Sequence, residues 1–109
     1  MTSTDDALII LCTCPNGDTA QTLASGLVES RRAACVNVMA NITSVYLWKG
    51  KVEKDNESLL IIKSTAANVD SITHWIQEHH PYELPEVVAV PIVAGLEPYL
   101  RWIHDVTES

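Results

Sequence analysis

Two long strand-like segments, joined by the turn signal Lys49-Gly50-Lys51, constrain the fold of this chain more than any other feature. Residues 35–48 lead into the turn and residues 52–63 run back, which predicts one antiparallel hairpin. Each arm is about twice as long as a typical strand. Both faces of the outer part carry apolar or aromatic side chains, namely Val45, Tyr46, Leu47 and Trp48. Because a free ribbon cannot hide so much apolar surface, the hairpin predicts pairing with further copies in a closed ring. The alternative is that the last helix of the chain covers the hairpin, but that helix is too short for both arms.

The segments before and after the hairpin alternate between strand and helix patterns. Residues 7–14 are a short apolar run ended by Pro15-Asn16-Gly17, which is typical of a buried central strand. A helix pattern follows, with apolar side chains at Ala20, Leu23, Ala24, Leu27 and Val28. A second helix is expected from Ser64 or Thr65 to the pair at residues 79–80. A fourth strand is expected over residues 86–93, with Pro91 favouring an edge position.

The resulting order is strand, helix, strand, strand, helix, strand and a last helix with Pro98 in its first turn. This order predicts an α+β fold of the ferredoxin-like split βαβ type, an antiparallel four-stranded sheet with two helices on one face. The long hairpin and the extra C-terminal helix are additions to that plan. We expect residues 1–6 to be a flexible N-terminus and residues 7–109 to form a single domain.

Charge and composition restrict the partners and the compartment. The chain has 14 acidic and 7 basic side chains and a net charge of −7, which argues against nucleic acid as a partner. No stretch is long and apolar enough to predict a membrane span. The first six residues lack the positive region of a secretory signal, so a cytoplasmic location is expected. The odd number of cysteines, 3, argues against a disulfide framework and leaves buried thiols or thiolate ligands.

Residues 79–86, His-His-Pro-Tyr-Glu-Leu-Pro-Glu, concentrate the chemistry of the chain. Two prolines restrict the backbone, so we expect an ordered, extended turn that presents its polar side chains. Imidazole and carboxylate groups together are candidate metal ligands. The alternative is a helix C-terminus, where His79 and His80 face the negative end of the helix dipole and Pro81 stops the helix.

Taken together, the hairpin and this turn resemble the CutA divalent-cation tolerance family. The matching pieces are residues 32–37 (Arg-Ala-Ala-Cys-Val-Asn), 44–53 around the hairpin turn, 57–63 on the return strand, and 79–86. In this order they cover the domain from about residue 7 to 104. The resemblance implies a ferredoxin-like subunit, a tight homotrimer with hairpins clasping between subunits, and a link to tolerance of copper and other divalent metals. It also implies a general likeness to the trimeric PII signalling proteins.

The resemblance further implies a copper site formed by Cys12, His79 and His80, to which Glu86 and Glu83 are candidate additions. Thiolate and imidazole ligands suit copper or zinc, and copper leads the divalent affinity order. Cys12 and Cys14 lie two apart on a strand and so share one face. The alternative is that these cysteines are packed core residues. No organic cofactor is implied.

Two other functions compete with metal binding. In the first, a signalling module of the PII type binds a small organic ligand in the clefts between subunits, lined by Tyr46, Trp48, Tyr82, Glu83 and Glu86. In the second, the trimer is structural and has no specific ligand. An enzyme is not expected, because Gly-x-Ser-x-Gly, His-Glu-x-x-His, phosphate-loop and Cys-x-x-Cys patterns do not occur. A nucleophilic pair of Cys12 or Cys14 with one of the two histidines stays open, without an orienting partner.

Overall fold

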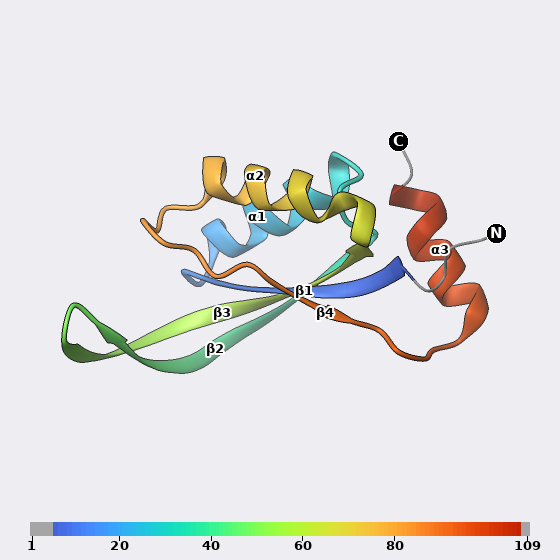
Figure 1. The fold of residues 1–109 in the computed structure, drawn as a ribbon. Helices are drawn as coiled ribbons and strands as arrows, with labels where there is room; N and C mark the ends of the chain where they lie inside the picture. The colour runs from blue at the N-terminus through green and yellow to red at the C-terminus, as the bar shows by residue number, and fades with distance from the viewer. Residues whose placement is uncertain (1–5, 108–109) are drawn as a thin grey trace.

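A computed structural model of the chain describes residues 6–107. Four strands form one sheet in the order β2-β3-β1-β4, and each is antiparallel to its neighbours. Figure 1 shows two helices on one side of this sheet and a third helix at its end. This confirms the predicted α+β, ferredoxin-like arrangement. The predicted flexible segment lies outside the described residues except for Asp6. The elements are β1 (Ala7–Cys14), α1 (Asp18–Glu29), β2 (Cys35–Trp48), β3 (Lys51–Thr65), the 3-10 turn η2 (Ala66–Asn68), α2 (Val69–His79), β4 (Val88–Pro91) and α3 (Glu97–Thr107).

The hydrophobic core lies between the sheet and the helices α1 and α2. Alternate side chains of the two central strands face the helices and are fully buried, among them Ile10, Cys12, Leu60 and Ile62. The helices contribute Leu23, Leu27, Ile72 and Ile76. Gly26 of α1 has no side chain, and a Cβ atom there would lie 2.4 Å from the Trp75 ring of α2. The close approach of the two helices therefore requires glycine at this position.

The opposite face of the sheet carries no helix in a single subunit (Figure 1). Its central side chains are mostly apolar: Ile9 and Leu11 of β1 lie opposite Lys63 and Ile61 of β3, and of these four only Lys63 is polar. The strands on either side add Met39, which is 51% exposed, and two half-exposed valines, Val88 and Val90. We call these residues (9, 11, 39, 59, 61, 88 and 90) the helix-free face.

The hairpin of β2 and β3 extends beyond the rest of the sheet (Figure 1). It pairs continuously to Trp48 opposite Lys51, apart from a bulge between Met39 and Ile42. The subunit is correspondingly elongated, with extents of 48 × 25 × 22 Å. Side chains near the turn are exposed on both faces: Val45, Leu47 and Val52 share one face at 63%, 71% and 74%, and Tyr46 on the other face is 40% exposed. The predicted long hairpin is therefore confirmed.

The base of the hairpin is held by the side chain of Asn16, in the loop after β1. Its Oδ1 atom accepts hydrogen bonds from the Asn41 backbone N–H at 3.2 Å and the Ser58 hydroxyl at 2.6 Å. Its Nδ2 atom donates to Asn56 Oδ1 at 2.6 Å. Asn41 has the positive φ of 62° that the bulge requires, a conformation asparagine tolerates well. These contacts fix the direction in which the hairpin leaves the sheet.

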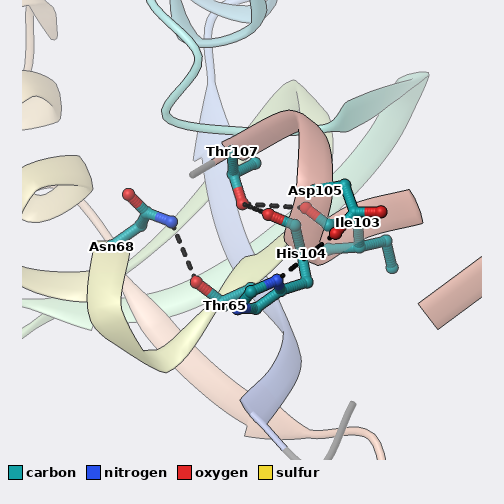
Figure 2. A network of polar contacts seen from close by, with 6 residues as sticks. All are labelled: Thr65, Asn68, Ile103, His104, Asp105 and Thr107. Atoms are coloured by element: carbon teal, nitrogen blue, oxygen red, sulfur yellow. Dashed lines mark hydrogen bonds and ion pairs between the residues drawn. The ribbon is translucent and has the colours of Figure 1, made fainter. Parts of the chain in front are cut away.

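Helix α3 packs against β3 and β1 at the end of the sheet away from the hairpin turn, so it does not cover the hairpin (Figure 1). Figure 2 shows its last turn beside the end of β3. The Thr107 hydroxyl donates to the Ile103 carbonyl at 2.8 Å, and Asn68 Nδ2 donates to Thr65 Oγ1 at 2.9 Å. Within residues 6–107, no helix has the length and apolar character needed to cross a membrane.

Two boundaries differ from those predicted. Strand β4 is limited to Val88–Pro91, shorter than the predicted residues 86–93, because residues 81–87 form the loop that crosses the end of β1. The second helix is preceded by the 3-10 turn η2, so α2 begins at Val69 and not at residue 64 or 65. Its end is as predicted: α2 finishes at His79, His80 is its extended C-cap, and Pro81 follows.

Candidate functional site

His80 is buried against the end of β1, with 7% of its surface exposed. Its Nε2 atom lies 2.8 Å from the Thr13 carbonyl oxygen, and its Nδ1 atom lies 3.1 Å from the Tyr82 backbone N–H. A carbonyl only accepts and an amide N–H only donates, so the ring carries its proton on Nε2 and accepts through Nδ1. Both nitrogens are therefore already engaged. The expectation that the turn presents this imidazole to solvent is wrong.

His79 has a different environment although it is the adjacent residue. Its side chain is exposed and stacks on the Trp75 ring, with centroids 4.1 Å apart and planes 16° from parallel. Its Nδ1 atom donates to the Trp75 carbonyl at 2.7 Å, which closes the last turn of α2. This contact leaves Nε2 pointing away from the backbone and available as an acceptor or a metal ligand.

Cys12 and Cys14 share one face of β1, as their spacing predicted, and both are fully buried on the side of the helices. Burial raises the pKa of the Cys12 thiol from 9.0 to about 12, with smaller contributions from Cys14, Glu86 and Glu57. Burial and the nearby Glu57 carboxylate raise the pKa of Cys14 to about 11. A metal bound by either sulfur would have to displace a strongly held proton.

A cleft of about 780 Å³ lies between the hairpin and the loop after α2. One of its lining residues is Glu57, which is 5% exposed and whose Oε2 atom accepts a 2.6 Å hydrogen bond from the Tyr82 hydroxyl. The Tyr46 hydroxyl donates to Asp55 at the hairpin side. The cleft is lined by Thr13, Ser44, Val45, Tyr46, Leu47, Trp48, Asp55, Glu57, Pro81, Tyr82, Glu83, Leu84 and Glu86.

Several acidic groups lie close together in this cleft, and their proximity and burial raise pKa values. Desolvation and, to a smaller extent, the Glu57 carboxylate raise the pKa of Glu86. The pKa of Tyr82 is raised by desolvation and by its hydrogen bond to Glu57. The hydrogen bond to Asp55 raises the pKa of Tyr46 to about 12. Each shift disfavours a further negative charge, so the cleft favours a cation.

The structure separates the two sets of candidate residues that the sequence suggested. Tyr46, Trp48, Tyr82, Glu83 and Glu86 line one cleft although they come from two distant segments. The four metal candidates do not converge: Cys12 is in the core, His80 is bonded at both nitrogens, His79 is exposed on α2 and Glu86 lines the cleft. Residues 6–107 contain no group of three His, Cys, Asp or Glu side chains placed to share a metal ion.

Two carboxylates of the cleft, Asp55 and Glu57, were missed as site residues. Both lie on β3, and their sequence context is that of an ordinary polar half-strand before the apolar run at residues 59–62. Tyr82, in the loop after α2, donates its hydroxyl hydrogen bond to Glu57. The alternating acidic residues at positions 53, 55 and 57 gave no sequence signal that distinguishes the buried carboxylate from the other two.

The split βαβ sheet with its projecting hairpin places this chain in the class of small α+β proteins with a ferredoxin-like fold. Comparison with known proteins makes the assignment narrower. The chain belongs to the CutA1 family, because the family model of the CutA1 divalent ion tolerance protein matches residues 8–106.

Individual relatives agree with this assignment. The protein CutA of Mus musculus is 50% identical over 97 residues, which are 89% of this chain and 55% of the mouse protein. This chain thus spans about half the length of its animal relatives. The divalent-cation tolerance protein CutA of Thermus thermophilus is 41% identical over 99 residues, covering 91% and 96% of the two chains.

Solved structures of relatives show the same fold. The divalent cation tolerance protein of Thermus thermophilus superposes with a TM-score of 0.91 at 40% identity, covering 94% of this chain and 99% of that one. CutA1 of Oryza sativa superposes with a TM-score of 0.92 at 39% identity, covering 97% and 98% of the chains. The long hairpin is therefore part of a fold that bacterial and plant proteins share.

Proposed function

We propose that this chain is a homotrimeric divalent-cation tolerance protein that serves metal homeostasis in the cytoplasm without catalytic activity. The observation that carries the proposal is the helix-free face, where apolar side chains cover the sheet on the side opposite α1 and α2. Ile61 and Leu59 alternate along β3 with the fully buried Leu60 and Ile62, yet they have no covering layer in one subunit. A sheet that is apolar on both faces is stable in water only when both are covered.

A closed three-fold assembly covers this face and uses the projecting hairpin as well. Three copies packed through the helix-free faces would exclude water from residues such as Ile9 and Ile61. The hairpins would then reach neighbouring subunits, which accounts for the exposed Val45, Leu47 and Val52 near the turn. Light scattering at micromolar concentration should give a mass about three times the 12.0 kDa of the subunit. A stable monomer under these conditions would rule the assembly out.

The metal proposal is that one divalent ion binds per subunit through His79 and/or His80, copper in preference to zinc, with Cys12 and Glu86 as further candidate ligands. The exposed Nε2 of His79 supports a first contact. His80 would have to release the Thr13 carbonyl or the Tyr82 amide, and Cys12 would have to lose its proton. We therefore rank His79 first among the ligands. The remaining ligands of the metal ion would come from a rearranged loop or from a neighbouring subunit.

Calorimetric titration of tag-free protein with Cu²⁺ and Zn²⁺ tests this proposal. His79→Ala should remove binding, and the double change with His80→Ala should do so as well, with the trimer intact in light scattering. His74→Ala is the matched control, since it removes an exposed imidazole from the same helix. Binding should weaken below about pH 6, because an imidazole must be neutral to coordinate a metal.

Cys12→Ser distinguishes the possible ligand sets. A loss of copper affinity with retained zinc affinity would place the thiolate in the site. If the double histidine variant binds both metals unchanged, the turn at residues 79–86 is structural. The metal-binding part of the proposal would then be abandoned, whatever the light-scattering mass.

A further inference from the structure

The cleft under the loop after α2 is unusual in the charge of its walls. Among the residues that line it are four carboxylates, Asp55, Glu57, Glu83 and Glu86, and neither lysine nor arginine. Its volume of about 780 Å³ falls within the range of small-molecule sites. Such a cleft repels anions, so nucleotides and other phosphates are poor candidates.

Glu57 provides a second and independent observation. Its side chain is 5% exposed, lines the cleft and has one hydrogen bond, from the Tyr82 hydroxyl to Oε2. Within residues 6–107 the ion pairs are Arg101 with Glu97 and His104 with Asp105, so no cationic side chain of the same subunit compensates Glu57. Burying a carboxylate is costly unless an opposite charge or several hydrogen bonds accompany it. A cation entering the cleft would supply that charge.

The spacing of the carboxylates argues against a metal ion as that cation. Three or more carboxylate or imidazole groups usually converge on a bound divalent ion, and residues 6–107 contain no such convergence. The carboxylates of the cleft instead surround a space of ligand size. A larger, molecular cation fits this arrangement better than a single ion.

The aromatic and apolar side chains that line the cleft indicate the chemistry of the uncharged part of that cation. Tyr46, Trp48 and Tyr82 contribute aromatic rings, and the His80 ring packs 4.6 Å from that of Tyr82. Apolar side chains, namely Val45, Leu47 and Leu84, complete the lining in one subunit, and the first two are also partner contacts in the proposed trimer. Aromatic rings beside carboxylates are the usual environment for ammonium groups, through cation–π attraction and charge.

We propose that this cleft binds a small organic cation, an amine whose ammonium group lies against Glu57 and Glu86 and whose apolar or aromatic body packs between Tyr46, Trp48 and Tyr82. This site shares the candidate ligand Glu86 with the proposed metal site, but it does not include His79 and does not depend on metal binding there. The protein would thereby have a small-molecule ligand in addition to its role in cation tolerance.

A series of ligands that share one body and differ in charge tests the proposal on the native protein. The probes are 2-phenylethylamine, 2-phenylethanol and 3-phenylpropanoate, titrated into isotope-labelled protein and followed by the Trp48 indole N–H and the backbone amides of the loop after α2. The amine should bind at least about tenfold more tightly than the alcohol, and the propanoate should bind least. Equal affinity of amine and propanoate, or no saturable shift with the amine at millimolar concentration, would overturn the proposal.

A variant pair assigns the effect to the buried carboxylate. Glu57→Gln retains an oxygen that accepts the Tyr82 hydrogen bond but removes the charge, and it should weaken amine binding about tenfold or more. Glu29→Gln replaces an exposed carboxylate of α1 by a carboxamide. It is the matched control and should bind the amine like the native protein. Unchanged amine affinity in a folded Glu57→Gln protein would overturn the assignment, and the ligand series decides the question alone if that variant does not fold.

Discussion

The two faces of the sheet both have an apolar centre but different surroundings. On the helix-covered face, Leu60 and Ile62 of β3 are 0% exposed beneath α1 and α2. On the helix-free face, their neighbours Leu59 and Ile61 are only partly buried. The two sets alternate along one strand, so strand propensity and backbone pairing are the same for both. The difference is the layer above them.

This comparison shows that a single subunit covers only one of the two apolar faces of its sheet. The covered face forms a closed core with two helices whose apolar faces match the sheet. In the proposed trimer, neighbouring subunits and their hairpins would cover the helix-free face. Residues of the two faces should therefore respond differently to the same substitution.

Adjacent isoleucines give the largest expected contrast. Ile62→Asp places a charge in the closed core, which costs more than the stability of an ordinary domain of this size can absorb, so the chain should fail to fold. Ile61→Asp places the same charge on the helix-free face, where a separate subunit can hydrate it. That variant should fold and remain monomeric. Circular dichroism and light scattering together distinguish the two results. A trimeric Ile61→Asp protein would show that this face is not the interface.

The next largest effect is expected where α1 and α2 pack closely in the closed core. Gly26→Ala should destabilise the protein by about 1–3 kcal/mol, because the added Cβ would meet the Trp75 ring at 2.4 Å. In an ordinary helix the same change is stabilising by about 1 kcal/mol, so the sign itself is informative. Ser25→Ala, one residue earlier on the exposed side of α1, is the control and should be neutral or slightly stabilising. Urea unfolding at fixed protein concentration measures both. An unchanged or raised midpoint for Gly26→Ala would mean that the helices separate easily.

The fold was largely predictable because the periodic spacing of apolar residues in the sequence indicates which side chains are buried in each helix and strand. The helical spacing of Leu23 and Leu27, and the apolar run of β1, gave the element order and the ferredoxin-like topology. Boundaries were less accessible. The short β4 depends on the loop after α2, which is tied to the end of β1 by the contact of His80 with Thr13. The 3-10 turn at residues 66–68 runs directly into α2, so the sequence pattern did not separate the two.

The candidate site was only half predictable for the same reason. The aromatic and acidic residues of the two distinctive segments were identified, and the structure gathers them in one cleft. Adjacent His79 and His80 could not be told apart in sequence, because their difference arises from stacking on Trp75 in one case and burial in the other. Glu57 could not be identified either, since its burial depends on Tyr82, 25 residues away in the sequence.

The thiols of the closed core give an effect that appears only at alkaline pH. Burial raises the pKa of Cys12 from 9.0 to about 12 and that of Cys14 to about 11. Above about pH 9 the unfolded chain releases these protons and the folded chain retains them, so the free energy of unfolding falls as pH rises toward the folded values. The loss is at most about 1.4 kcal/mol per pH unit for each thiol. Urea unfolding between about pH 8 and 11 under reducing conditions should show the decline.

Cys12→Ala should make this decline shallower, because the variant has one fewer thiol to titrate on unfolding. Cys35→Ala, at the start of β2, leaves both core thiols in place and should retain the native slope. The comparison uses slopes and not absolute stabilities, so the packing cost of removing a sulfur atom does not affect it. An identical slope for Cys12→Ala and the native protein would mean that the Cys12 thiol titrates alike in the folded and unfolded chains. The helix-covered face would then be open enough to hydrate a thiolate, and the contrast between the two faces would be smaller than their exposure indicates.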